Sequence, residues 1–556
     1  MRRMTTLLLA LLGLPAFLQS DTFPVEITVD TSRSKGPLRE IWRFFGADEP
    51  NYAYMKDGEK LLGQLGAMDP GHVYFRAHNL MTSGDGTPAL KWGSTNIYTE
   101  DENGDPVYDW TLVDLIFDTY LENGVRPYVQ MGFMPEALSS HPDPYKHTWR
   151  PGLPYEWIYT GWAYPPNDYS KWGELCHQWA LHCVERYGME EVEQWYWETW
   201  NESNAPYWQG TPEELYKLHD YAMAGVLRAI PKARVGGPDS AGYGGDWTRS
   251  FLEHCLRGRN YATGETGTRL DFVSFHAKGS PEYAGDHIRM GIAHQLREID
   301  KGFALVASFP ELRDTPIVIG ESDPEGCAAC QGDRFSYRNG TMYSSYTAAS
   351  FARKRDLADK HGINFAGALT WAFTFEDQPY FAGFRQLASN GIALPVLNVF
   401  RMMSRMSGNR VACRSTSEVP LQTMIDSGVR EDPDVAALAS VDGRRVWVMV
   451  WHYHDDDLPG PEALVSLKIK GLPESAGGAR LKHYRVDEFH SNAYDLWRRW
   501  GEPVAPDEHQ YEQLEAASDL ARLEDSPDSV DIDRGVASLR FNLPRQGVSL
   551  LVLDLE

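Results

Sequence analysis

The stretch EQWYWETWNE, residues 193–202, is an apolar and aromatic segment that ends on Asn201 and Glu202. Segments of this kind occur eight times before residue 400, and each is followed by a loop and a stretch with helical spacing, such as 169–187 and 212–230. The predicted strands are 41–47, 72–77, 126–132, 193–200, 234–238, 270–276, 316–320 and 365–373. Eight alternations of strand and helix over about 360 residues predict an α/β fold, a (β/α)8 TIM barrel. A doubly wound sheet is the alternative, although no glycine fingerprint follows a first strand.

A different pattern begins near residue 400, where short alternating segments are separated by Gly, Pro and Asp turns. Such alternation is typical of an antiparallel β-sandwich. The predicted strands of this part are 435–440, 446–452, 463–469, 479–486, 536–542 and 548–555. An early segment, 25–30, alternates in the same way. The predicted domains are therefore an N-terminal strand at 21–40 that joins the sandwich, a catalytic barrel at 41–400 and a C-terminal β-sandwich domain at 401–556.

The first 20 residues have the features of a signal peptide. Two arginines precede an apolar stretch at 5–17, and residues 18–20 form a cleavage site before Asp21. A stretch of this length with these flanks is too short for a membrane helix. We therefore expect residues 1–20 to be removed on export, and the mature protein to be periplasmic or secreted.

The acidic composition excludes several classes of partner. The chain has 53 Lys and Arg against 78 Asp and Glu, a formal net charge of -25. An acidic surface repels phosphate backbones and anionic lipid, so neither nucleic acid nor a membrane is expected as a partner. A neutral or small partner is expected instead, and the composition specifies no oligomeric state.

The six cysteines are too few to form the framework of a chain of 556 residues, even in an oxidising compartment. Cys327 and Cys330 are expected to form a local disulfide or to remain two free thiols. A zinc site would need two further ligands at matching spacing, and none is evident. The run His452–Asp457 contains metal-ligand residue types, but it follows a sandwich strand as a turn does. No metal and no cofactor are therefore expected.

Polar side chains follow the predicted barrel strands at their C-terminal ends, where the reactive residues of such barrels lie. Two of them, Glu202 after the fourth strand and Glu321 after the seventh, are carboxylates that end apolar strands, where an unpaired charge is costly. These strands face each other across the barrel mouth. Paired carboxylates are what acetal hydrolysis requires, one to protonate the leaving oxygen and one to meet the oxocarbenium carbon. The other candidates at strand ends are Arg76, His78, Asn201, His276, Lys278, Trp371 and Glu376.

The distance between the two carboxylates decides the stereochemical outcome. A separation of about 5 to 5.5 Å gives retention, and about 6.5 to 9.5 Å leaves room for water and gives inversion. Aromatic residues around Glu202 predict a low-dielectric setting that raises its pKa toward the working pH. Two structural alternatives are open: Trp195 and Trp197 belong to the barrel core, or Glu202 forms an ion pair with a neighbour such as Arg76. The aromatic residues are Trp195, Trp197, Trp200, Tyr207 and Trp208.

Five strand-end motifs carry a resemblance to a known group of enzymes. In chain order they are Arg76-Ala-His78, Trp200-Asn201-Glu202, Phe275-His276, Glu321 and Trp371. Their joint order resembles the large clan of retaining (β/α)8 glycosidases. Within that clan the chain resembles glycoside hydrolase family 39, which holds β-xylosidases and α-L-iduronidases. The resemblance covers nearly the whole mature chain, including a stretch at 484–501 that looks like the family's sandwich domain.

The resemblance assigns roles to the residues that match the family's motifs. It implies that Glu202 is the general acid/base and Glu321 the nucleophile. Asn201 would bond the sugar hydroxyl next to the reacting carbon. Arg76 would lie beneath the nucleophile and hold it ionised by an opposite charge. The family usually has Pro after the acid/base, whereas this chain has Ser203.

The glycone pocket that the resemblance implies is lined by His78 and His276, with Trp371 as its floor. Lys278 bears on the choice of sugar, because the family's iduronidases carry a His-x-Lys-Gly pattern whose Lys meets the uronic carboxylate. An ion pair of Lys278 with the acidic residues at 376–377 is the structural alternative.

The expected activity is that of a retaining exo-glycosidase on small oligosaccharides or glycosides, acting through a covalent glycosyl-enzyme. A β-xylosidase of the xylan 1,4-β-xylosidase type is the first expectation. An α-L-iduronidase-like uronidase and an arabinose-type pentosidase of the same family are the alternatives, followed by a non-catalytic carbohydrate-binding protein.

Overall fold

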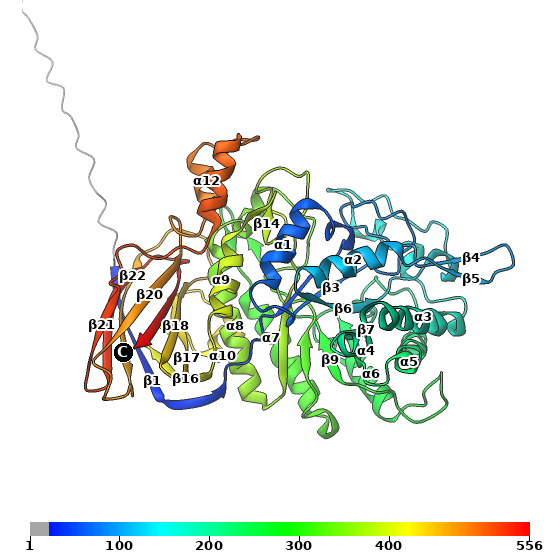
Figure 1. The fold of residues 1–556 in the computed structure, drawn as a ribbon, viewed down its shortest axis with the longest axis horizontal. Helices are drawn as coiled ribbons and strands as arrows, with labels where there is room; N and C mark the ends of the chain where they lie inside the picture. The colour runs from blue at the N-terminus through cyan, green and yellow to red at the C-terminus, as the bar shows by residue number, and fades with distance from the viewer. Residues whose placement is uncertain (1–21) are drawn as a thin grey trace, which may run out of the picture.

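The computed structural model describes residues 22–556 and contains a barrel beside a β-sandwich (Figure 1). The predicted signal peptide, residues 1–20, lies outside the described residues. Eight parallel strands of the described chain form the barrel in chain order, and the last strand pairs with the first. They are β2 (Phe44–Ala47), β3 (Val73–Ala77), β6 (Val125–Met131), β7 (Tyr196–Thr199), β8 (Arg234–Ser240), β9 (Phe272–Phe275), β12 (Ile317–Ile319) and β13 (Phe365–Thr370).

The predicted (β/α)8 barrel is confirmed, and a strand lies within or close to each of the eight predicted ranges. The doubly wound alternative is wrong, because the pairing of β13 with β2 closes the sheet and leaves no edge. The barrel interior is packed mostly by aromatic side chains, which accounts for part of the Phe and Tyr content of its strands. These interior residues are Phe44, Tyr74, Tyr128, Tyr196, Phe272, Val318, Leu369 and Trp371.

Helices between the strands cover the outside of the barrel (Figure 1). The predicted helix at 169–187 is α3 (Tyr169–Tyr187), which begins after Asp168, whose carboxylate accepts hydrogen bonds from two backbone N–H groups of the first turn. The one predicted at 212–230 is α5 (Pro212–Ala229), which begins with a capping box. The other helices of this part are α1 (Lys56–Gly66), α2 (Thr111–Glu122), α4 (Met189–Val192), α6 (Asp246–Arg257), α7 (Ile292–Ala307), α8 (Thr341–His361) and α9 (Pro395–Ser404).

The second sheet has nine strands in the order β1-β16-β17-β18-β23-β20-β21-β22-β19, closed by the pairing of β19 with β1. Strand β1 runs parallel to β19 and antiparallel to β16, so the sheet is mostly antiparallel. Two of its strands, β16 and β21, were not predicted, because they are short and carry polar residues at most positions. The strands are β1 (Thr22–Pro37), β16 (Asn409–Ser415), β17 (Asp434–Asp442), β18 (Arg445–Tyr453), β19 (Glu462–Lys470), β20 (Gly478–Val486), β21 (Ser529–Asp533), β22 (Val536–Leu543) and β23 (Val548–Leu555).

Two further helices support the loop that follows the eighth barrel strand. They are α11 (Ala493–Arg499) and α12 (Glu508–Ser518), which interrupt the sandwich between β20 and β21, and α12 projects from the top of the molecule in Figure 1. The ring of Trp497 lies 5.1 Å from that of Phe381, and the Tyr511 hydroxyl donates to the Asn390 carbonyl at 3.1 Å. The loop after β13 is therefore held by side chains from the sandwich end of the chain.

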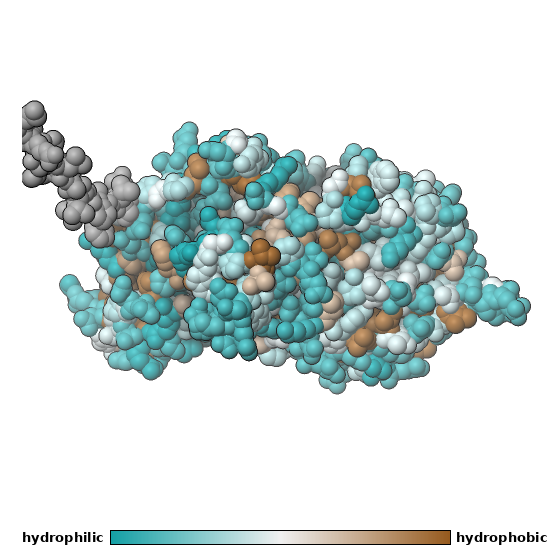
Figure 2. Space-filling model, turned by 90° about the horizontal axis from the view of Figure 1, so that it is seen from above, coloured by the Kyte–Doolittle hydropathy of each residue, from teal (hydrophilic) through white to brown (hydrophobic). Residues whose placement is uncertain are grey.

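The remaining elements are short. Hairpins are formed by β4 (Tyr98–Glu100) with β5 (Pro106–Tyr108), by β10 (Glu282–Tyr283) with β11 (Ile288–Arg289) and by β14 (Ala388–Ser389) with β15 (Ile392–Ala393), and α10 (Leu421–Ser427) precedes β17. Figure 2 shows a largely hydrophilic face on which apolar residues form small separate patches. Within residues 22–556, no helix combines the length and the apolarity that crossing a bilayer requires.

Candidate active site

The fourth barrel strand ends in a strained turn that carries Asn201 and Glu202. Trp200 and Glu202 have φ values of 69° and 44°, in a region that residues other than Gly rarely occupy. Backbone hydrogen bonds hold the turn, from Trp200 N–H to the Met131 carbonyl at 3.0 Å and from Glu202 N–H to the Asp239 carbonyl at 2.9 Å. Both neighbouring strands therefore fix the position of Glu202.

Lys278 lies between the two predicted catalytic carboxylates. Its Nζ is 2.6 Å from Glu202 Oε1 and 2.8 Å from Glu321 Oε2. His276 Nδ1 also reaches both residues, at 2.8 Å from Glu202 Oε1 and 3.7 Å from Glu321 Oε1. An oxygen of Glu202 and an oxygen of Glu321 lie within 4.8 Å of each other, which is well below the separation of about 6.5 to 9.5 Å that inversion requires. Strand ends four, six and seven thus meet as predicted.

Glu376 lies elsewhere. Its carboxylate accepts hydrogen bonds from the backbone N–H groups of Asp57 and Gly58, in the first turn of α1, where a negative charge suits the helix dipole. The structure therefore places Glu376 in a helix cap, away from the contacts that Lys278 and His276 make with the two predicted catalytic carboxylates. Since the Lys278 ammonium pairs with those carboxylates, the alternative ion pair of Lys278 with residues 376–377 is wrong.

The charges of this cluster shift the pKa values of its members. Burial raises the pKa of Glu321, but Lys278 and His276 outweigh burial and lower it from 4.5 to about 2. Burial likewise raises the pKa of Glu202, yet Lys278 and His276 hold it well below its ordinary range. Burial lowers the pKa of His276, but Asp239 and Glu321 raise it from 6.5 to about 9. At neutral pH the free protein therefore holds two carboxylates and an imidazolium here.

The predicted rise in the pKa of Glu202 is therefore wrong for the free protein, because a contacting ammonium outweighs the low-dielectric surroundings. The aromatic residues of the strand contribute little to those surroundings. Trp195 packs against Phe117 with ring centroids 5.4 Å apart, and Trp197 packs against Trp179 at 6.0 Å, on the side of the helices. Both are fully buried, so the alternative that they belong to the core is confirmed.

Arg76 pairs with two carboxylates other than the predicted nucleophile. Its Nε is 2.7 Å from Glu198 Oε2, and its Nη2 contacts Asp239, because both acidic residues project toward it from β7 and β8. The guanidinium that contacts Glu321 is that of Arg385, whose Nη2 lies 3.2 Å from Oε2. Burial lowers the pKa of Arg76, but nearby carboxylates, Glu321 among them, raise it above its ordinary value. The charge of Arg76 thus acts on the predicted nucleophile without a direct ion pair, and the ion pairs of Arg76 in the described chain do not include Glu202.

The predicted floor of the pocket is held by Asp48, which follows the first barrel strand. Its Oδ1 lies 3.0 Å from His78 Nδ1 and accepts a hydrogen bond from Trp371 Nε1 at 3.1 Å, and the two rings are 4.2 Å apart. Its Oδ2 pairs with the Lys91 ammonium. Since His78 Nε2 is 3.9 Å from Glu321 Oε1, the floor adjoins the predicted nucleophile.

Asn201 presents an unused amide donor. Its Oδ1 accepts a hydrogen bond from Arg76 Nη2 at 3.2 Å, whereas its buried Nδ2 has no partner among residues 22–556. A buried donor without a partner costs about 1–3 kcal/mol, so a ligand hydroxyl that accepts this bond is favoured. Ser203, in the position where the family usually has Pro, accepts a hydrogen bond from Trp247 Nε1 at 3.1 Å and so ties the turn to α6.

Several polar residues of the site were missed in the sequence. Asp48 and Asp239 carried the same signal as Glu321, a polar residue at the end of an apolar strand, and Asp323 follows Glu321 by two residues. Arg385 lies far along an irregular loop, where no periodicity points to it. The missed residues are Asp48, Lys91, Glu198, Asp239, Asp323 and Arg385.

The remaining cysteine and metal predictions concern three places. Cys327 and Cys330 form a disulfide. In the run His452–Asp457, His454 Nδ1 accepts a hydrogen bond from Asp456 N–H at 3.0 Å, a local contact of the kind that turns contain. Within the described chain, ligand atoms of Glu202, His276 and Glu321 lie close enough together to hold a metal ion, but the ammonium described above already bridges the two carboxylates.

The chain matches a known protein family and solved structures of the same fold. The model of glycosyl hydrolases family 39 matches residues 25–531. A β-xylosidase of Geobacillus stearothermophilus is 27% identical over 87% of this chain and 86% of its own, and human α-L-iduronidase is 24% identical over 92% and 76%. A family 39 enzyme from Xanthomonas axonopodis pv. citri has the same fold, with a TM-score of 0.73 at 22% identity over 97% of this chain and 99% of its own. The chain belongs to glycosyl hydrolases family 39 and is a glycosidase.

Proposed function

We propose that this protein is a retaining exo-glycosidase of the β-xylosidase type. The observation that carries the proposal is the approach of Glu202 and Glu321, from opposite barrel strands, to within 4.8 Å. That separation suits direct attack by a carboxylate better than attack by an intervening water. The likeness to the Geobacillus β-xylosidase over most of both chains supports xylose as the glycone.

Glu321 is the nucleophile in this proposal. Its pKa of about 2 keeps it ionised, and attack on the anomeric carbon forms the covalent glycosyl-enzyme while the glycosidic bond breaks. Only 3% of Glu321 is exposed, which suits attack on a terminal sugar that fills the pocket. Asn201, through its unpartnered Nδ2, holds the hydroxyl beside the reacting carbon.

Glu202 protonates the leaving oxygen and then activates water. The ionised state of Glu202 in the free protein requires a proton to arrive before the bond breaks. A sugar that enters between the carboxylates and moves Lys278 away from Glu202 leaves burial as the main influence, and burial raises the pKa of Glu202. Protonated His276, whose Nδ1 is 2.8 Å from Glu202 Oε1, is the adjacent proton source.

The test of the proposal is the Glu321→Ala variant with an aryl β-xyloside. Turnover should fall to background, and azide should restore it with a glycosyl azide of inverted configuration, because the small anion fills the space of the missing carboxylate. A Glu311→Ala variant, which removes a surface carboxylate paired with Arg257, controls for the loss of a glutamate. Unimpaired turnover by Glu321→Ala would exclude Glu321 as the nucleophile.

A uronidase is the second candidate function, and the two cations beside Glu321 are the observation that favours it. Lys278 Nζ and Arg385 Nη2 lie 2.8 Å and 3.2 Å from Glu321 Oε2, where a carboxylate on the glycone would find opposite charge. Human α-L-iduronidase matches 92% of this chain, but at lower identity than the Geobacillus β-xylosidase.

A panel of aryl glycosides separates these candidates. Aryl β-xyloside, α-L-iduronide and arabinosides should be compared by kcat/KM on the wild type and on Lys278→Met. A β-xylosidase predicts the highest value for the xyloside. A preference for the iduronide that is lost in Lys278→Met would assign the uronidase function instead, and binding without hydrolysis across the panel would support a carbohydrate-binding protein.

We also propose that the protein is exported. The apolar N-terminal stretch with its two arginines supports export, and so does the Cys327–Cys330 disulfide, because disulfides persist mainly in oxidising compartments. N-terminal sequencing of the protein from its native host tests the proposal, which predicts a mature chain that begins at Asp21.

A further inference from the structure

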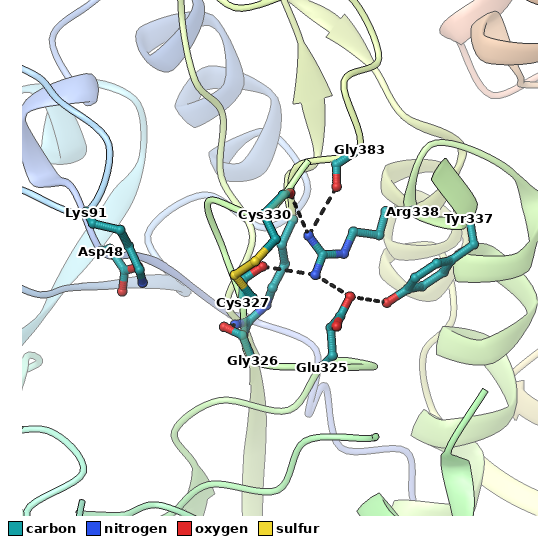
Figure 3. Close-up of a disulfide and its surroundings, with 10 residues drawn as sticks. Asp48, Lys91, Glu325, Gly326, Cys327, Cys330, Tyr337, Arg338 and Gly383 are labelled. Carbon is teal, nitrogen blue, oxygen red and sulfur yellow. Dashed lines mark hydrogen bonds and ion pairs between the residues drawn. A yellow bond between two sulfur atoms is a disulfide. The ribbon is translucent and has the colours of Figure 1, made fainter. Parts of the chain in front are cut away.

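The disulfide closes a loop that follows the predicted nucleophile by only a few residues (Figure 3). The backbone of this loop, residues 325–330, contacts Arg385 at two points. The Gly326 carbonyl accepts a hydrogen bond from Arg385 Nη1 at 2.8 Å, and the Ala328 carbonyl accepts one from Arg385 N–H at 3.1 Å. The loop therefore holds both the side chain and the backbone of Arg385.

Two of the cations beside Glu321, Arg385 and Lys278, contact this loop. Arg385 is 2% exposed, and its Nη2 is 3.2 Å from Glu321 Oε2 and also bonds Asp323. Gly326 packs against the other cation, because a Cβ added at Gly326 would lie 3.3 Å from Lys278 Cδ. A shift of the loop would thus move the charges that keep Glu321 ionised.

The side chain of Arg338 binds the loop at the disulfide itself (Figure 3). Its Nη2 donates to the Cys327 carbonyl at 2.9 Å, and its Nη1 donates to the carbonyls of Cys330 at 3.3 Å and Gly383 at 3.1 Å. It also pairs with Glu325 and is fully buried. Since Gly383 precedes Arg385 by two residues, Arg338 ties the disulfide loop to the segment that presents Arg385.

We propose that the Cys327–Cys330 disulfide is a positioning device for the reaction, which fixes Arg385 against Glu321. The cross-link acts by restricting the carbonyls of Gly326 and Ala328, which accept hydrogen bonds from Arg385. Without the cross-link the loop gains backbone freedom, and Arg385 loses fixed acceptors. The proposal rests on the proposed role of Glu321.

The first test measures the position of Arg385 without using activity. Dithiothreitol delivers two electrons and two protons to the S–S bond, which opens to two thiols while the reagent closes to its cyclic disulfide. Hydrogen–deuterium exchange of a peptide covering residues 381–389 should then rise about tenfold at Arg385 N–H, because its acceptor is the Ala328 carbonyl. The Cys327→Ser/Cys330→Ser variant should show the same rise without reductant. Unchanged exchange in both samples would overturn the proposal.

The second test measures the charge state of Glu321 through the pH profile. In the double variant, kcat with an aryl glycoside should fall about tenfold with little change in KM. The acid limb of kcat/KM should move up by about one pH unit, since a guanidinium no longer holds Glu321 ionised. Cys413→Ser, which changes a free cysteine on β16, is the matched control and should leave both quantities unchanged.

The outcomes separate this proposal from the proposed function. An acid limb and a kcat that match the wild type, with the disulfide shown by mass spectrometry to be absent, would overturn the positioning role. If Glu321→Ala kept full activity, the assignment of the nucleophile would fail, whereas the exchange measurement would still decide whether the disulfide positions Arg385. Where the double variant does not fold, the reduced wild type supplies both measurements.

Discussion

Two clusters of buried titratable residues lie at the ends of strands, and they are held in different ways. At the barrel mouth, Glu202 accepts hydrogen bonds from the side chains of His276 and Lys278. At the sandwich corner, which we define as His452–Asp457, Asp455 accepts from the backbone N–H of Val429 and from the Tyr453 hydroxyl, and it pairs with Arg430 at 3.0 Å. Both clusters contain His and acidic residues, but the Asp455 carboxylate also has a backbone partner, whereas the hydrogen bonds to the Glu202 carboxylate come from side chains.

The pKa shifts of the carboxylates in the two clusters have opposite directions. Burial raises the pKa of Asp455 to about 7, because its partners compensate little of the lost hydration. At the barrel mouth, cations outweigh burial and lower the pKa of Glu321 to about 2. Cations thus keep Glu321 ionised, whereas Asp455 binds a proton more readily, because one contact with Arg430 does not outweigh its burial.

The largest contrast is expected between Glu321→Ala and Asp455→Ala. Loss of the nucleophile should lower kcat/KM by about 10⁴-fold or more and leave stability close to the wild type. Loss of Asp455 should lower the free energy of unfolding by about 1–3 kcal/mol, because Val429 N–H loses its acceptor, and should change kcat less than twofold. Steady-state kinetics and urea unfolding of both variants measure this contrast. An Asp455→Ala variant that folds but has no activity would contradict the expected contrast.

The next effect depends on the leaving group. Glu202→Ala should lower kcat for a substrate with a poor leaving group by about 10³-fold, since proton donation contributes about 10²–10⁴-fold. For a dinitrophenyl glycoside, which needs no proton to depart, formation of the glycosyl-enzyme should be nearly unaffected. The expected time course is a burst of dinitrophenol release followed by slow turnover. Equal losses for both substrates would contradict the role of Glu202 as the acid.

A smaller effect concerns stability against pH. The pKa of His276 is raised from 6.5 to about 9, so its contribution of about 3 kcal/mol is present below pH 6.5 and is lost as the pH rises through 9. The pKa of His452 is lowered to about 4, so its contribution changes only below pH 6.5. Urea unfolding between pH 6.5 and 9 should show a decline in the wild type and in His452→Gln, and a smaller decline in His276→Gln. The same slope in all three proteins would refute the assignment.

The smallest effect expected is a shift of the alkaline limb of kcat/KM. Lys278→Met removes the cation that lowers the pKa of Glu202 most, so this pKa rises and the protonated acid persists to higher pH. The limb should therefore move upward by about one pH unit. Lys360→Met, which removes a surface lysine paired with Asp300, is the control. A downward shift in Lys278→Met would contradict the proposed influence of Lys278.

Much of the fold followed from the sequence, because alternation and strand-end residues are local signals. Apolar strands that end on Asn201 and Glu202, or on Glu321, indicated both the barrel and the place where its strands meet. Strand β16 was missed, since its sequence NRVACRS has too little alternation to stand out from a loop. Its pairing with β1 is a long-range contact that no local pattern encodes.

Residue types at the ends of strands could be predicted for the site, but the contacts between those residues could not. Which cation contacts Glu321 depends on the path of the loop after β13, and so Arg385 was missed, while Arg76, expected beneath Glu321, pairs directly with Glu198 and Asp239. The direction of the Glu202 pKa shift depends on a contact of 2.6 Å with Lys278, which outweighs the effect of burial. Sequence periodicity carries no information on such distances.

The most direct test of the account is labelling by a 2-deoxy-2-fluoro glycoside with a dinitrophenyl leaving group, built on the sugar that the wild type hydrolyses best. Fluorine slows breakdown of the glycosyl-enzyme, so the covalent intermediate should accumulate. Mass spectrometry of the digested protein should then find one added sugar, on the peptide that contains Glu321, and none in Glu321→Ala. A label on another residue, or rapid turnover to a product of inverted configuration without any label, would contradict the central claim.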